Sequence, residues 1–141
     1  MQRKATAVWR GGLKDGKGEL STDSGVLKQS QYSFGTRFEN GIGTNPEELL
    51  AAAHAGCFTM ALSAQLGGAG MTAQKLETTA TITLEKLADG FAITKSHLDL
   101  VAKIPGGDRT KFDAAVSAAV KGCPVSKLFK AEISVSARLE P

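Results

Sequence analysis

Two cysteines and two histidines are the side chains of this sequence best suited to thiol chemistry or metal binding. Cys57 lies in the apolar stretch TNPEELLAAAHAGCFTMALSAQL (44–66), three residues after His54, and Cys123 lies in GCPVSKLF (122–129). Any small apolar residue would satisfy packing at position 57. The sulfur there could therefore be a core filler, half of a structural disulfide, a metal ligand or a nucleophile.

Metal binding and acyl transfer are two chemistries that the residue types allow but the spacing does not favour. A metal site would use His54, Cys57, Cys123 and His97, yet the chain has no C-x-x-C and no fixed histidine pair, and structural zinc takes four ligands. A cysteine–histidine acyl-transfer pair is conceivable because His54 and Cys57 share nearly one helix face. However, no stretch resembles an oxyanion-hole loop, and a histidine on an apolar helix is more often a hydrogen-bonded core residue.

Cys123 follows directly after a predicted helix stop, Gly122, and precedes Pro124, which could open another helical turn. This arrangement places the sulfur near a helix N-terminus, where the thiolate form is favoured. Cys57 and Cys123 can meet only if the helix that ends at Gly122 packs against the helix that carries Cys57. The residues alone indicate thiol chemistry and leave the roles of the two sulfurs open.

Composition and charge describe a globular chain of one domain, 1–141, of which 42% is hydrophobic. The net charge of +3 comes from scattered lysines and arginines without a basic stripe, so we expect no nucleic-acid partner. Two cysteines are too few for a secreted disulfide scaffold. The start of the chain lacks a signal-peptide pattern, and 44–66 matches a membrane span poorly, so we expect no membrane association and a cytoplasmic location.

The pattern of apolar and turn residues predicts the elements that position these side chains. Short alternating runs bounded by turn residues indicate six strands, at 4–10, 19–27, 32–38, 79–87, 91–104 and 131–139. The first three form an antiparallel meander, and the turn at 88–90 joins the clearest hairpin. A helix over 108–122 starts at the N-cap Asp108 and stops at Gly122. The fold class is therefore α+β, βββ-α-ββ-α-β, with a mainly antiparallel sheet.

The long helix around Cys57 has a clear start and no polar face. Asn45 is a strong N-cap, Pro46 suits the first helical position, and Glu48 can reach back to the cap, which leaves Glu47 without a structural role. The helix runs to about Leu66, roughly 20 residues or about 30 Å. A helix that is apolar all round must be buried all round, and one sheet covers one side only. We therefore expect a homodimer in which a second copy covers the other side.

Three stretches of the sequence carry a resemblance to a known family. TRFENGIGTNPEELLAAAHAGCFTMALS (36–63) and GCPVSKLFKAEI (122–133) are similar to the two signature blocks of the OsmC/Ohr family of hydroperoxide reductases. They are closer to the osmotically inducible OsmC branch, and WRGGLKDGKGELSTDSGVL (9–27) extends the resemblance over nearly the whole chain. The resemblance implies the OsmC-like fold, in which the sheet packs on a long central helix in an intertwined homodimer.

The resemblance also implies a role for each matching residue. Cys57 matches the peroxidatic cysteine of the family and Cys123 the resolving one. Arg37 matches the arginine that lowers the thiol pKa and orients the peroxide, with Arg10 as the alternative. Glu47 matches the glutamate partner of that arginine. Because Glu47 and Cys57 are about 15 Å apart along one helix, we expect each site to be built from both subunits.

The activity implied by the resemblance is thiol-dependent reduction of organic hydroperoxides, and of hydrogen peroxide, to alcohols in oxidative and osmotic stress. Attack on the peroxide converts Cys57 to a sulfenic acid, which condenses with Cys123 to a disulfide that an external dithiol reduces. No metal, haem or flavin is needed. The alternative is a non-catalytic dimeric binding protein on the same fold, in which the two sulfurs stay apart.

Overall fold

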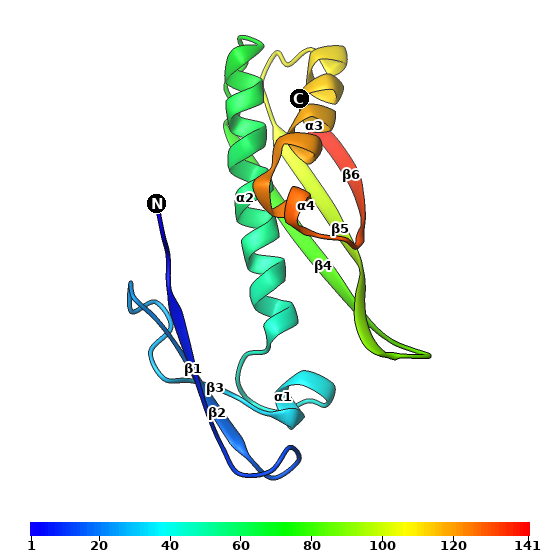
Figure 1. Ribbon diagram of the computed structural model, residues 1–141. Coiled ribbons are helices and arrows are strands. Elements are labelled where there is room, and N and C mark those ends of the chain that lie inside the picture. Colours follow the sequence, from blue (N-terminus) through cyan, green and yellow to red (C-terminus); the bar gives the residue numbers. More distant parts are fainter. The chain divides into compact units, whose positions relative to one another are not determined.

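The computed structural model describes residues 1–141, and its backbone forms two compact units, Met1–Leu49 and Leu50–Pro141. In the first unit, three strands pair in an antiparallel sheet in the order β1-β2-β3. The elements of this unit are β1 (Ala5–Arg10), β2 (Lys17–Thr22), β3 (Ser30–Tyr32) and the short helix α1 (Phe34–Phe38) (Figure 1). The antiparallel meander predicted for this part of the chain is confirmed.

The strand predicted over 32–38 is wrong beyond Tyr32, because Ser33 caps a helix and the residues after it form α1. A reciprocal capping box starts the helix: Ser33 Oγ accepts a hydrogen bond from the Thr36 N–H at 3.3 Å, and Thr36 Oγ1 accepts one from the Ser33 N–H at 2.7 Å. The cap uses threonine where the better-known pattern has glutamate or glutamine. The aromatic and β-branched composition of the segment therefore gave the wrong prediction.

The strand predicted over 19–27 also ends early, at Thr22. The Thr22 N–H donates to the Leu27 carbonyl at 3.0 Å, and the Leu27 N–H donates to the Thr22 hydroxyl at 3.1 Å. These two bonds close a turn that takes the chain out of the sheet, with Gly25 at a φ of 78°.

The long helix α2 (Pro46–Gly68) starts just before the second unit and continues through it. It is followed by β4 (Lys75–Leu87), β5 (Gly90–Lys103), α3 (Arg109–Gly122), α4 (Pro124–Leu128) and β6 (Glu132–Glu140). The predicted hairpin is confirmed as β4 and β5, whereas β6 pairs with β5 in parallel. The predicted βββ-α-ββ-α-β order is thus confirmed, with α1 and α4 added and the strands divided between two sheets.

The hydrophobic core of the second unit lies between helices α2 and α3 and one face of the β4-β5-β6 sheet (Figure 1). Alternate residues of β5 point into this core. Helix α3 begins at its predicted N-cap, Asp108, whose carboxylate accepts a hydrogen bond from the Lys111 N–H at 2.8 Å. The buried core residues are Phe58, Leu62, Leu66, Leu98, Leu100, Ala102, Ile104, Phe112, Ala115, Val116, Ala119 and Cys123.

Helix α2 buries one face within its own chain and leaves the other exposed. The buried face carries one residue per turn, from His54 through Phe58 and Leu62 to Leu66. The opposite face is lined by small residues and by Met60, whose side chain is 78% exposed. By length and composition alone, α2 could also cross a membrane, but the core helices of soluble proteins have the same properties. The packing of its buried face is that of a core helix.

Candidate active site

The two cysteines meet where α2 passes the junction of α3 and α4. Cys57 lies at mid-helix on α2 and is partly exposed, whereas Cys123 ends α3, precedes α4 and is fully buried. Both are free thiols, and their sulfurs are close enough to hydrogen bond. The two cysteines could meet only if α3 packs against α2, and this packing is present. The alternative in which the sulfurs stay apart is wrong.

The surroundings of the two thiols shift their acidities in opposite directions. Burial raises the pKa of Cys57, and the hydrogen bond with Cys123 raises it further, against a weaker opposing effect of the Val125 N–H. Burial also acts to raise the pKa of Cys123. Hydrogen bonding from the Cys57 thiol, the N–H and hydroxyl of Ser126 and the Val125 N–H outweighs burial and lowers that pKa overall. The pKa of Cys57 is therefore raised and that of Cys123 is lowered.

His54 lies one turn before Cys57 but is bound to other groups. Its ring is fully buried, with Nδ1 2.6 Å from Ser96 Oγ and Nε2 2.8 Å from Ser126 Oγ. Because both ring nitrogens are occupied, His54 does not act as a base toward Cys57. This arrangement confirms the prediction of a hydrogen-bonded core histidine and does not support the acyl-transfer pair.

The four side chains considered for a metal site do not form one group. His97 lies on the exposed side of β5, where its Nδ1 is 2.6 Å from Ser134 Oγ. His54 is held by two serines instead, and no three histidine, cysteine, aspartate or glutamate side chains form a group that could hold a metal ion.

Arg37 and Glu47 form an ion pair within the first unit. The Nε and Nη2 atoms of Arg37 each lie 2.9 Å from the same carboxylate oxygen, Glu47 Oε1. The other oxygen, Glu47 Oε2, is buried without a hydrogen-bond partner. A buried carboxylate oxygen without a partner is unusual in a folded protein. Glu47 thus presents an acceptor that its own chain leaves free.

The start of α2 explains why Glu47 is available for this pair. Asn45 caps the helix, since its Oδ1 accepts a hydrogen bond from the Glu48 N–H at 2.7 Å. The capping pattern predicted that Glu48 reaches back to the cap residue Asn45. Instead, the Glu48 carboxylate accepts a hydrogen bond from the Thr44 hydroxyl at 2.7 Å, one residue earlier. Glu48 is therefore held at the helix start.

The alternative arginine, Arg10, makes only a loose contact of 3.7 Å with Glu19 at an exposed position.

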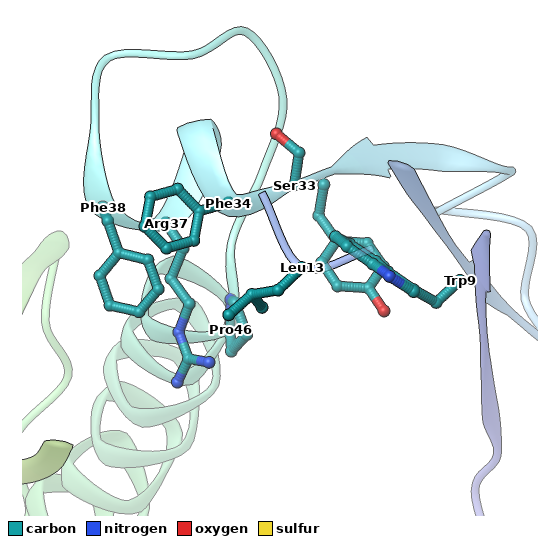
Figure 2. A pocket seen from close by; sticks show the side chains of 8 residues that line it. Trp9, Leu13, Ser33, Phe34, Arg37, Phe38 and Pro46 are labelled. Carbon is teal, nitrogen blue, oxygen red and sulfur yellow. The ribbon is translucent and has the colours of Figure 1, made fainter. Parts of the chain in front are cut away.

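A cleft of about 260 Å³ opens beside Arg37 in the first unit. Figure 2 shows the Arg37 guanidinium with Phe34 and Phe38 on one side of the cleft and Leu13 and Trp9 on the other. The guanidinium carbon lies 5.3 Å from the centre of the Phe38 ring, and this ring packs against Phe34 at 4.9 Å. The lining is thus apolar except for a cation and a few hydroxyl groups, a composition that suits an organic molecule with one polar end. The residues that line the cleft are Trp9, Leu13, Tyr32, Ser33, Phe34, Arg37, Phe38 and Pro46.

A family model described as OsmC-like protein matches residues 38–138. This chain belongs to the OsmC-like family. Peroxiredoxin OsmC of Escherichia coli (strain K12) is 51% identical over 140 residues, which cover 99% of this chain and 98% of that protein. The organic hydroperoxide resistance protein OhrB of Bacillus subtilis (strain 168) is 31% identical over 124 residues, 87% of this chain and 89% of that protein. The crystal structure of the B. subtilis organic hydroperoxide resistance protein OhrB matches with a TM-score of 0.69 at 29% identity, covering 97% of this chain and 98% of that one.

The OsmC-like chain therefore brings together, within each unit, the residues that the sequence singled out. Cys57 meets Cys123 in the second unit, and Arg37 meets Glu47 in the first. The roles that the resemblance implies for these four residues stay predictions. Ser126 was not predicted, because a single serine three residues after a cysteine carries no signal of its own.

Proposed function

We propose that this chain is a thiol-dependent peroxidase that reduces organic hydroperoxides to alcohols, with Cys57 as the attacking and Cys123 as the resolving thiol. The observation that carries the proposal is the contact between two free thiols on different helices. Its relatives named peroxiredoxin OsmC and organic hydroperoxide resistance protein support the same activity.

Access supports Cys57 as the attacking thiol although Cys123 is the more acidic. A peroxide must contact the sulfur that it oxidises, and Cys123 is 0% exposed whereas Cys57 is partly exposed. Attack also requires a thiolate, and the local environment raises the pKa of Cys57 through burial and the bond to Cys123. A cation is therefore needed beside Cys57 in the working site. Arg37 is our candidate for this cation, since Glu47 fixes its orientation from one side of the guanidinium.

The reaction then proceeds in three balanced steps. The Cys57 thiolate attacks one peroxide oxygen, the O–O bond breaks, and the leaving alkoxide takes a proton to become the alcohol. Cys123 next attacks the sulfenic sulfur of Cys57, which forms the S–S bond and releases the hydroxyl as water. An external dithiol finally reduces the disulfide by thiol–disulfide exchange. The cleft beside Arg37, with its aromatic and aliphatic lining, favours organic hydroperoxides over hydrogen peroxide.

A homodimer is part of the proposal, because α2 exposes an apolar face of small residues that one chain does not cover. Beside Gly56 and Gly67 the space is open, so a second helix could approach closely. The unpartnered Glu47 Oε2 supports a site completed by the second subunit. In such a dimer both units of the chain would contribute to the same peroxidase activity. The location that we propose is the cytoplasm, a reducing compartment that can supply the external dithiol.

Mass spectrometry of the protein after one equivalent of cumene hydroperoxide tests this proposal. We expect the loss of two hydrogens, reversed by dithiothreitol, for the unchanged chain. Cys57→Ser should consume no peroxide, and Cys123→Ser should complete one turnover and accumulate a sulfenic acid. If Cys57→Ser keeps the first turnover, the two roles are reversed. If the unchanged chain gains oxygen atoms stepwise without forming a disulfide, the peroxidase proposal is wrong.

A further inference from the structure

His54 is a buried titratable group that the reaction steps above do not use, and its hydrogen bonds lead toward Cys123. We propose that His54 is a positioning residue that acts through Ser126 to stabilise the thiolate of Cys123 while the disulfide forms. This inference rests on the proposed function for its consequence in turnover. Its structural basis does not depend on that function: the buried hydrogen bonds Ser96–His54–Ser126, and the place of Ser126 three residues after Cys123 in the first turn of α4.

Ser96 determines which ring nitrogen of His54 carries the proton. The Ser96 side chain is fully buried, and its hydroxyl has one protein partner, His54 Nδ1 at 2.6 Å. If Nδ1 carried the proton, the hydroxyl proton of Ser96 would be buried without an acceptor, which is costly. Ser96 therefore donates to Nδ1, and the proton of the neutral ring lies on Nε2.

This tautomer directs the Ser126 hydroxyl toward Cys123. The Nε2–H of His54 donates to Ser126 Oγ at 2.8 Å. The Ser126 hydroxyl therefore does not donate to the ring, and its proton is available to another acceptor. The same hydroxyl is one of the groups whose hydrogen bonding lowers the pKa of Cys123. Without His54, the hydroxyl could rotate away from the sulfur. His54 thus holds a donor in place rather than acting on the sulfur itself.

The donor matters most after the first oxidation. In the resting pair, the Cys57 thiol donates to Cys123, but once Cys57 has become a sulfenic acid that S–H no longer exists. Ser126 is then the remaining side chain whose hydrogen bonding lowers the pKa of Cys123, together with the backbone of Val125 and Ser126. In the resolving step the Cys123 thiolate attacks the Cys57 sulfur, the S–O bond breaks, and the hydroxide leaves with a proton as water. Sulfenic acid that is not resolved can be oxidised further to sulfinic acid.

The groups around this network are few and mostly uncharged. Ser96 from β5, Ser126 from α4 and the Phe129 ring, centred 5.0 Å away, contact the His54 ring. Burial lowers the pKa of His54, so the ring stays neutral near pH 7 and keeps one N–H. The titratable group that faces Cys123 is Cys57 from α2. Replacing Cys57 by serine therefore leaves Cys123 as the only thiol and keeps a hydroxyl at position 57.

The experiment measures thiolate absorbance in the ultraviolet against pH in the Cys57→Ser background, with a variant lacking both cysteines as baseline. This readout needs neither peroxide nor access to the buried sulfur. We expect Ser126→Ala to raise the pKa of Cys123 by about one unit, the effect of losing one hydrogen bond to a charged acceptor. His54→Ala should raise it in the same direction, and His54→Gln, which can present an N–H near the Nε2 position, should restore much of the difference.

His97→Ala is the matched control, because His97 is also hydrogen bonded to a serine but lies on the exposed side of β5. It should leave the pKa of Cys123 unchanged. The proposal is overturned if Ser126→Ala leaves the pKa unchanged, if His54→Ala and His54→Gln behave alike, or if His97→Ala shifts it equally. If circular dichroism shows that His54→Ala does not fold, Ser126→Ala and Ser96→Ala provide the test instead. Ser96→Ala removes the group that fixes the tautomer of His54, so it should raise the pKa of Cys123 less than Ser126→Ala does.

Turnover gives the second readout, in chains with both cysteines and cumene hydroperoxide as the probe. Ser126→Ala should form the sulfenic acid at the unchanged rate, form the disulfide about 10-fold more slowly, and collect more sulfinic acid per turnover. Equal disulfide rates would refute the role in resolution. If the unchanged chain shows no peroxide reduction at all, the proposed function fails, and the titration above still decides the role of His54.

Discussion

Mixing two inactive variants tests whether each active site contains residues from both subunits of the proposed dimer. Glu47 and Cys57 lie on the one continuous helix α2, ten residues apart, which is about 15 Å along the axis. Side chains that reach a few ångströms cannot close this distance within one chain. Two copies of α2 packed antiparallel about a twofold axis would bring the start of one beside the middle of the other.

The variants are Cys57→Ser and Glu47→Ala, each first shown to be impaired alone. In a shared-site dimer, the heterodimer contains one site with both native residues and one site with neither. Equal amounts that assort at random give about half heterodimers, so about one quarter of all sites should be complete. Peroxide consumption should therefore recover to roughly a quarter of the unchanged level, after co-refolding and with heterodimers counted by native mass spectrometry.

A mixture of Cys57→Ser and Cys123→Ser is the matched control. Both cysteines belong to one unit of the same chain and hydrogen bond to each other, so no heterodimer of these two variants contains a complete pair. Dithiol-dependent turnover should stay absent in this mixture. If the Cys57→Ser and Glu47→Ala mixture also stays inactive while heterodimers are present, each site is built within one chain and the shared-site reasoning is refuted.

Three further predictions address the arginine, the buried histidine and the exposed face of α2. Arg37→Ala should raise the pH at which Cys57 is alkylated in a Cys123→Ser background, whereas Arg10→Ala should not; the opposite result would move the role to Arg10. Because burial lowers the pKa of His54, the unfolded state binds a proton at a higher pH than the folded state. The free energy of unfolding measured in urea should therefore fall as the pH drops below about 6.5. His54→Gln should flatten that dependence, and an unchanged slope would contradict it. Met60→Asp should give monomers in light scattering without loss of helix content, since Met60 is 78% exposed within the chain.

Local sequence signals were sufficient for the elements whose ends are set by neighbouring residues. Asn45 and Asp108 cap α2 and α3 as predicted, because a cap needs only a side-chain oxygen and an N–H three residues later. The β4–β5 hairpin follows from alternating strands around a turn that ends at Gly90, whose φ of 129° favours glycine. The segment that forms α1 was mispredicted because the Ser33 and Thr36 hydroxyls replace the usual acidic cap.

Contacts between distant segments could not be derived from local patterns. The parallel pairing of β6 with β5 joins strands separated by two helices. Ser96 and Ser126, the partners of His54, are 42 and 72 positions away from it, and serine is too common to mark either position. The contact of Cys57 with Cys123 was anticipated only as a condition on helix packing. The family resemblance supplied the pairing that the residues left open.

The hydrogen bond between the two thiols explains how one short helix junction can serve both halves of the proposed reaction. While both sulfurs are reduced, Cys57 donates its proton toward Cys123, and the first ionisation belongs to the pair rather than to one residue. A cation placed beside Cys57 would draw the negative charge to that sulfur and leave the proton on Cys123, where peroxide has no access. Oxidation of Cys57 then removes this partner, so Cys123 must ionise with the help of Ser126 and the N–H groups of α4 alone. The acidity of the buried thiol is thus needed in the second step, and the accessibility of the partly exposed thiol in the first.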